Sequence, residues 1–195
     1  MTSNMIFTCT LCGECCSGDM KVFLNSYDLY RMAQFHNMAE TGELFDRNLV
    51  MMEEGQNGLL LPRIRFKSNP YPFCPFLIND FSEEKGLRGL CSLHPDHKPL
   101  VCRLAPLTRT LDLDSREEQF DFIPPHPGCP GCGRGDRLNP EVIGKEMREE
   151  LDFEMRYFRL LRQCARQREE IPDRLFRFSV SRRFEEILGD WENRG

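Results

Sequence analysis

The sequence lacks a long apolar run, a basic leader and a concentration of positive charge. No stretch approaches the roughly 20 apolar residues needed to cross a bilayer, and residues 1–7 show neither the basic nor the apolar region of a signal peptide. The formal net charge of -5 gives no electrostatic footprint for nucleic acid. We therefore expect a cytoplasmic protein that binds neither membranes nor nucleic acid.

The sequence also lacks the common signatures of enzymes. It contains no glycine-rich phosphate loop, no Walker motif, no Rossmann fingerprint and no local nucleophile–base pair. What it does contain is 10 cysteines in 195 residues. Because thiols stay reduced in the cytosol, cysteines there are more typical of metal ligands than of disulfides.

Four of these thiols lie within eight residues near the N-terminus, at Cys9, Cys12, Cys15 and Cys16. The C-x2-C-x2-C spacing is the local half of a ferredoxin-type cluster site. In an extended chain, successive side chains point to opposite sides. The vicinal pair Cys15-Cys16 therefore serves two different sites more easily than one.

The remaining cysteines follow at long intervals. Cys74 and Cys129 each precede a proline, Cys91 follows Leu90, and Cys102 precedes Arg103. The ordered set Cys9-x2-Cys12-x2-Cys15-Cys16, Cys74-Pro-Phe-Leu, Cys91-Ser-Leu and Pro99-x2-Cys102-Arg103-x2-Pro106 resembles the CxxCxxCC family, also called YkgJ-like, which is described as zinc- or iron-chelating. The likeness extends over residues 9 to about 135 and includes Asp28-Leu-Tyr-Arg31. A related domain occurs in flagellin lysine N-methylases, so the resemblance also admits a methyltransfer role by analogy.

The resemblance implies eight metal-binding cysteines, namely Cys9, Cys12, Cys15, Cys16, Cys74, Cys91, Cys102 and Cys129, with Cys132 as a possible ninth. We interpret them as two four-cysteine sites. One takes Cys9, Cys12 and Cys15 with a cysteine that precedes proline, and the other takes Cys16 with three remote cysteines. A single site with spare thiols is the alternative.

The metal is predicted to be iron–sulfur, as one or two [4Fe–4S] clusters, with zinc as the competitor. Close packing of thiols in C-x2-C-x2-C favours a cluster. The two C-x2-C-Gly segments at Cys9 and Cys129, however, resemble zinc knuckles that together complete one tetrahedral site.

Other polar residues near the cysteines are secondary candidates. Arg103 can bind an anionic cofactor or donate to a thiolate, and equally can form a surface ion pair. The histidines His94, His97 and His126 lie in turns, where solvated histidines are commoner than ligands. Cys164 lies within a predicted helix and is expected to be a buried free thiol.

The fold is predicted to be α+β, with short antiparallel strands and many helices. We expect a helix capped by Ser26, a second helix over 41–54 and an edge strand around Pro62. A helical turn at 100–106 and a hairpin of 108–113 with 119–123 should follow. Asn139-Pro140-Glu141 starts a helix to about residue 170, and Pro172-Asp173 starts a last one. Residues 1–138 are predicted to form the metal-binding domain and residues 139–195 a helical extension packed on it.

Three functions remain open from the sequence. The first is a small metal-cluster protein whose metal-free chain is largely unfolded, because metal-binding free energy becomes folding free energy at such sites. The second is an enzyme, either redox-active or a lysine methyltransferase using S-adenosylmethionine. The third is a zinc-stapled module that binds a protein partner through its C-terminal helices.

Overall fold

The computed structural model describes residues 5–18, 20–55, 59–69, 71–84, 86–167 and 171–193. Within them, the strands form four two-stranded antiparallel sheets, so the predicted α+β class is confirmed. The strands are β1 Ile6–Phe7, β2 Val50–Glu54, β3 Leu60–Ile64, β4 Leu77–Ser82, β5 Gly86–Cys91, β6 Leu107–Leu111, β7 Glu118–Phe122 and β8 Asp136–Arg137. The helices are α1 Ser26–Phe35, α2 Gly42–Asp46, α3 Leu100–Leu104, α4 Pro140–Glu146, α5 Arg148–Gln167 and α6 Phe184–Glu192, with 3-10 turns η1 Glu14–Cys16 and η2 Asp173–Leu175.

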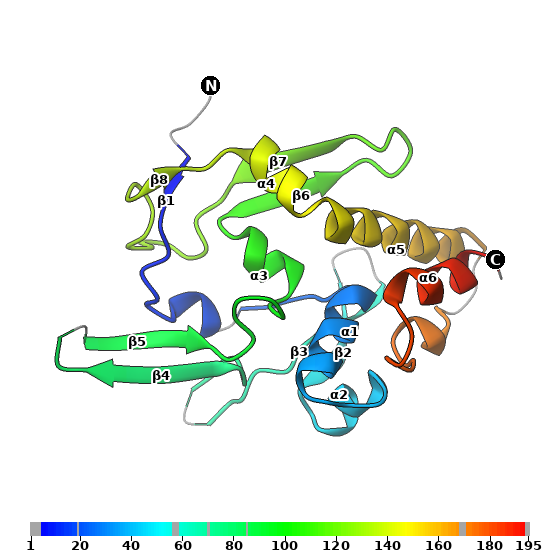
Figure 1. Ribbon diagram of the computed structural model, residues 1–195, viewed down its shortest axis with the longest axis horizontal. Helices are drawn as coiled ribbons and strands as arrows, with labels where there is room; N and C mark the ends of the chain where they lie inside the picture. The colour runs from blue at the N-terminus through cyan, green and yellow to red at the C-terminus, as the bar shows by residue number, and fades with distance from the viewer. Residues whose placement is uncertain are drawn as a thin grey trace.

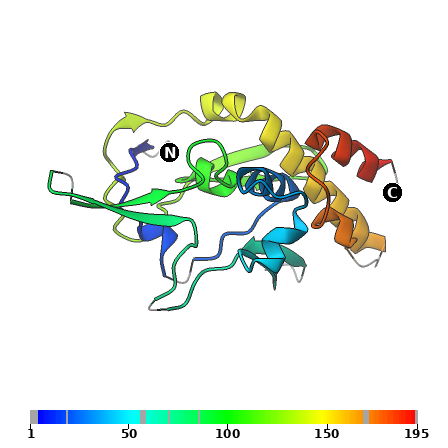
Figure 2. The ribbon, with the colours of Figure 1, turned by 60° about the horizontal axis from the view of Figure 1, so that its bottom comes forward.

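The elements are arranged along one long axis. The β4–β5 hairpin projects at one end, and α5 and α6 lie at the other (Figures 1 and 2). The short helix α3 lies between the β4–β5 hairpin and the β6–β7 hairpin (Figure 1). Apart from α5, which contains Cys164, the cysteine-bearing segments are therefore gathered toward the hairpin end of the molecule.

Helix α1 begins one residue earlier than the sequence indicates. Its N-cap is Asn25, whose side chain accepts from the Asp28 N–H, while the Asp28 carboxylate accepts from the Asn25 N–H to complete a capping box. Ser26 is the first helical residue, and its hydroxyl donates to the carbonyl of Leu175 instead of capping the helix. The buried side of the helix includes Leu29 and Met32.

The helix predicted over residues 41–54 is wrong in its second half. Helix α2 ends at Asp46, and the chain turns at Asn48 with a φ of 57° before it enters strand β2. The apolar side chains of this stretch fit a helix locally, but pairing of Val50 with Ile64 and of Met52 with Pro62 draws the chain into a sheet. Tertiary pairing overrides local preference here. Pro62 lies in a two-stranded sheet, in which every strand is an edge, as predicted.

The C-terminal segment is divided more finely than predicted. The N-cap at Asn139 is confirmed, since its side chain accepts from the Glu141 N–H. The single helix expected from there is interrupted at Met147, which is buried with Leu100 and Leu151 in a small second core. Residues 168–170 at its predicted end lie outside the described residues. The last helix does not run from Pro172, because η2 and an extended segment precede α6.

One hydrophobic core joins α1 to the C-terminal helices. Leu29, Leu161 and Leu188 are 0–1% exposed within it. The aromatic rings of Phe178 and Phe184 pack edge-on against Trp191. The division of the chain into two domains stays a prediction, although both parts contribute to this core.

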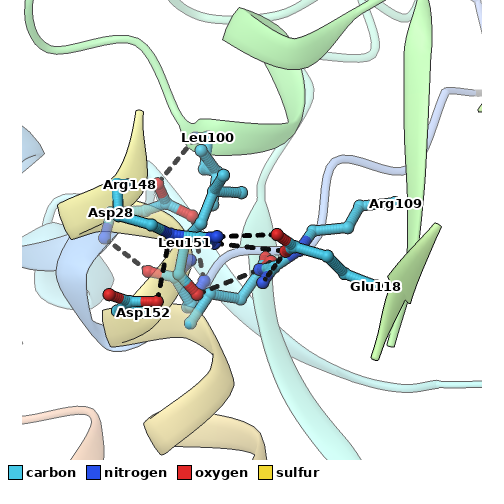
Figure 3. Close-up of polar contacts among 9 residues, drawn as sticks. Asp28, Leu100, Arg109, Glu118, Arg148, Leu151 and Asp152 are labelled. Atoms are coloured by element: carbon cyan, nitrogen blue, oxygen red, sulfur yellow. Dashed lines mark hydrogen bonds and ion pairs between the residues drawn. The ribbon is translucent and has the colours of Figure 1, made fainter. Parts of the chain in front are cut away.

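A buried arginine connects the β6–β7 hairpin to α5. The Arg109 side chain is 3% exposed, and its Nη2 pairs with Glu118 Oε2 at 2.6 Å on the neighbouring strand. Its Nη1 reaches Glu154 Oε2 at 2.8 Å and the carbonyl of Leu151 at 3.0 Å on the helix (Figure 3). A planar guanidinium with five N–H groups can satisfy several acceptors at once, so this one residue fixes the hairpin on the helix.

Candidate metal centre

A cavity of about 260 Å³ lies at the convergence of four cysteine-bearing segments. Most of its wall is apolar. Its cysteine thiols come from four segments. Cys15 and Cys16 belong to the N-terminal cluster, Cys74 precedes β4, Cys91 ends β5, and Cys102 lies in α3. The charged residues on its wall are Lys21 and Lys98. Five of the eight cysteines predicted as ligands thus meet at one place.

The vicinal cysteines lie in a tight turn, not in an extended chain. Cys15 and Cys16 form the 3-10 turn η1, closed by the Cys16 N–H donating to the carbonyl of Gly13 at 2.9 Å. Their Sγ atoms are 4.0 Å apart and line the same cavity. The premise of extended backbone at this pair is therefore wrong, because a 3-10 turn brings successive side chains closer than a strand does.

The position of η1 depends on contact between two glycines. Gly13 precedes the turn with a φ of 77°, a left-handed conformation that glycine adopts without steric cost. A Cβ on Gly89 of strand β5 would lie 2.5 Å from the Cα of Gly13, so the two backbones touch. The Gly89 N–H donates to the carbonyl of Leu11 at 2.6 Å. The opening cysteine segment is thereby fixed against the root of the β4–β5 hairpin.

Backbone hydrogen bonds also place Cys74 and Cys91 next to η1. The Cys74 N–H donates to the carbonyl of Cys16 at 2.7 Å. Leu77, which follows Cys74 by three residues, is paired with Cys91 across the β4–β5 ladder. These bonds bring three distant thiols to one wall without a contribution from the sulfur atoms themselves.

Cys102 is placed by a buried carboxylate. Asp28 Oδ1 accepts from the N–H of Leu100, the first residue of α3, at 2.8 Å (Figure 3). Its Oδ2 accepts from the Asn25 N–H, so one side chain caps two helices. Burial raises the pKa of the Asp28 carboxyl to about 7, and the two backbone donors oppose that rise. The sequence singled out Asp28 only through the family resemblance.

Replacement of Asp28 by alanine is expected to destabilise the fold by about 2 kcal/mol, because two buried N–H groups lose their acceptor. Asp28→Asn keeps one acceptor oxygen, so we expect a smaller loss. Urea denaturation followed by circular dichroism measures both values. Equal stability of Asp28→Ala and the parent chain would contradict this capping role.

The thiols of the cavity influence one another's ionisation. Accepting a hydrogen bond from the Cys16 thiol lowers the pKa of Cys15 to about 6, with a further contribution from Lys98. Donating that bond raises the pKa of Cys16, and burial acts in the same direction. Burial raises the pKa of Cys74 to about 11 and also raises that of Cys102. A metal ion that binds here displaces protons from these sulfurs, since thiolates are its ligands.

Arg103 follows Cys102 but does not line the cavity. Its Nη1 pairs with Glu150 Oε1 on α5 at 2.6 Å, and Arg31 Nη1 pairs with the same oxygen at 3.2 Å. Both arginines are three-quarters buried or more. The Arg103 side chain thus joins α3 to α5 through an ion pair, which is one of the two roles that the sequence suggested for it.

The other predicted cysteines lie outside the cavity. Cys9 and Cys12 are exposed, and Cys129 and Cys132 are half-buried. The Sγ of Cys12 is 3.9 Å from Nε2 of His126. Burial and a hydrogen bond to the Cys129 thiol raise the pKa of Cys132. Cys164 is half-buried on α5.

The donor set of the cavity fits a soft metal. Thiolates select zinc, copper(I) and iron–sulfur clusters, whereas magnesium and calcium require oxygen ligands. Two lysines on the wall offset the negative charge that several thiolates bring. Among the described side chains, no three His, Cys, Asp or Glu residues already surround one point at the distance of a single-ion site. Lys98, which faces two of the thiols, gave no signal in the sequence.

Fold and cavity together define a cysteine-rich α+β domain with the donor set of a metal-thiolate protein. The chain belongs to the CxxCxxCC family, described as "Putative zinc- or iron-chelating domain", whose family model matches residues 8–130. This match confirms the resemblance seen in the sequence, and it leaves Cys132 and the C-terminal helices outside the matched range. Searches of curated proteins and of solved structures found no match. In the described part of the chain, no helix has the length and apolar character needed to cross a membrane.

Proposed function

We propose that the chain holds an iron–sulfur cluster in the cavity through Cys16, Cys74, Cys91 and Cys102. The observation that carries this proposal is the convergence of thiols from separate segments on one cavity of about 260 Å³. The spacing of ferredoxin-type sites combines local and remote cysteines in the same way. This set is one of the two that the sequence interpretation left open for Cys16 with three remote cysteines, the other having Cys129 in place of Cys74.

The size of the cavity favours a cluster over a single ion. A zinc ion with Zn–S bonds of about 2.3 Å draws four sulfurs to within about 3.8 Å of one another. Among the described residues, no three cysteine, histidine or carboxylate side chains are placed to hold one such ion. A cluster contains several iron and sulfide atoms, so its ligands lie around a larger volume. Lys21 and Lys98 supply positive charge next to the net negative charge of a four-thiolate cluster.

Cys15 is the fifth thiol of the cavity, and a [4Fe–4S] cluster takes four. We leave Cys15 outside the ligand set because the sequence interpretation places it with Cys9 and Cys12 at the other site. Once the cluster has displaced the Cys16 proton, the Cys15 thiol is the group that can donate to the Cys16 sulfur, 4.0 Å away. Hydrogen bonds to cluster-bound sulfurs tune the potential of such centres.

Protein purified without oxygen should be brown and contain iron and acid-labile sulfide in equal amounts, about four of each per chain for one [4Fe–4S] cluster. Elemental analysis, sulfide assay and the visible absorption spectrum measure this. Reconstitution with iron and sulfide under reducing conditions serves as the second preparation. A colourless chain with no labile sulfide after both preparations would refute the iron–sulfur proposal.

A further inference from the structure

A second group of metal-binding side chains lies outside the cavity. It consists of Cys12, His126, Cys129 and Cys132, none of which lines the cavity wall. These four residues come from two segments more than 100 residues apart in sequence. Their donor atoms are three thiols and one imidazole, which is the Cys3His composition of many structural zinc sites.

Strand pairing lays these two segments side by side. Strand β1 pairs antiparallel with β8, and Phe7 bridges to Cys132 itself. The Thr8 N–H donates to the carbonyl of Gly131 at 3.2 Å. A Cβ on Gly131 would lie 2.3 Å from the carbonyl oxygen of Thr8, so this close approach requires glycine. The segment leading to Cys12 is therefore held against the Cys129–Cys132 turn by main-chain contacts.

The Cys129–Cys132 turn presents its two thiols together. The Cys132 N–H donates to the carbonyl of Cys129 at 3.1 Å, which closes the turn. The Cys129 thiol interacts with that of Cys132 and raises its pKa. The Arg134 N–H donates back to the carbonyl of Gly131 at 3.3 Å. A closed C-x2-C turn of this kind supplies two of the four ligands of a zinc knuckle.

His126 is held in the tautomer that a metal requires. Its Nδ1 lies 3.0 Å from the carbonyl oxygen of Pro127, and because a carbonyl only accepts, Nδ1 is the nitrogen that donates. The lone pair is then on Nε2, the atom 3.9 Å from the Cys12 sulfur. Metal-binding histidines commonly have this arrangement. In a tetrahedral zinc site, bonds of about 2.3 Å to sulfur and about 2.0 Å to nitrogen place the two donors about 3.5 Å apart.

We propose that Cys12, His126, Cys129 and Cys132 form a second metal site, which binds one zinc ion. The structure contains its two halves, the Cys12–His126 pair and the Cys129–Cys132 pair, and zinc binding draws the halves together. The mixed nitrogen and sulfur donors suit zinc, which prefers four-coordinate tetrahedral sites of this composition. The site shares no ligand with the cavity cluster, so the two proposals are independent. It also gives a role to Cys132, which lies beyond the family match.

The test uses the full chain, purified without oxygen, then treated with Zn²⁺ and desalted. We expect about one zinc per chain, and X-ray absorption at the zinc edge should show three sulfur ligands and one nitrogen ligand. Cys132→Ser and His126→Gln should each lower zinc affinity at least tenfold in competition with a chromophoric chelator and leave iron content unchanged. Cys164→Ser and His94→Gln serve as matched controls that keep the zinc, since Cys164 lies on α5, His94 is exposed, and both lie outside the proposed set.

The outcomes separate the two metal proposals. Loss of iron without loss of zinc in Cys102→Ser is the result expected if both sites exist. Zinc retained at full affinity in both Cys132→Ser and His126→Gln overturns the second site. An all-sulfur zinc spectrum in the parent chain also overturns it, because His126 is then not a ligand. The parent spectrum decides the question even if a variant fails to fold.

Discussion

Cys102→Ser is expected to lose nearly all of the iron bound by the parent chain. Removal of a supporting residue around a metal typically costs roughly 10- to 100-fold in affinity, and removal of a ligand costs more. A serine hydroxyl does not ionise near neutral pH and is a harder donor than a thiolate, so it replaces the sulfur poorly. Cys102 is a sensitive position because α3 holds it in place through the Asp28 contact to Leu100.

The matched control is Cys164→Ser. Cys164 lies on α5 and does not line the cavity, so its replacement should leave iron and labile sulfide at the parent level. Both variants are compared by elemental analysis after purification without oxygen, and circular dichroism confirms that each is folded. A folded Cys102→Ser chain with its full content of iron would exclude Cys102 from the ligand set.

Removal of all metal is expected to release the cysteine-bearing segments while the helical core persists. In the described residues, segments 5–18 and 108–138 contribute no side chain to the buried hydrophobic set. The β6–β7 hairpin is held on α5 by the Arg109 contacts, and the rest of these segments is held by the short β1–β8 pair, loop hydrogen bonds and, in our proposal, by metal. Helices α1, α5 and α6 instead share a core of buried apolar side chains. The sequence alone led us to expect a largely unfolded metal-free chain, and the structure limits the expected unfolding to these segments.

Hydrogen exchange measured before and after chelation under reducing conditions tests this division. Amides of residues 5–18 and 126–137 should exchange at least roughly tenfold faster without metal, because local opening no longer breaks metal bonds. Amides around Leu29 and Leu161 should keep their protection. Equal loss of protection in both regions would show that metal holds the entire fold, and no change in either would show that it holds neither.

Local signals in the sequence predicted the parts of the fold that depend on local chemistry. The Asn139-Pro140-Glu141 helix start needs only a cap, a fixed φ and an acidic first turn, and it is present. The β6–β7 hairpin was readable from its alternating pattern. The strand at Val50–Glu54 was not, because its apolar side chains also fit a helical repeat and only pairing with Leu60–Ile64 makes it a strand. A pattern of period 3.6 cannot report such pairing.

The candidate site shows the same limit. Spacing and residue type indicated which cysteines were metal-binding candidates, but spacing alone does not determine which thiols share a cavity. The turn at Cys15-Cys16 depends on Gly13 meeting the backbone of Gly89, a contact across 76 positions of sequence (89 minus 13). Likewise His126 lies in a proline-rich loop, and two contacts distinguish it from a solvated histidine: the hydrogen bond of its Nδ1 to the next residue's carbonyl and the Cys12 sulfur near its Nε2.

The touching glycines at positions 13 and 89 have a consequence for the rest of the β4–β5 hairpin. Only the base of the hairpin contacts the segment from Cys9 to Cys16. Phe81 and Leu87, which lie farther from the base, are 72% and 68% exposed. The outer half can therefore change in length or composition between related chains without moving a sulfur atom. The inner half cannot vary in this way. One methyl group added at position 89 would push β5 away from the segment that contains Gly13, and Cys12 and Cys15 would move with that segment.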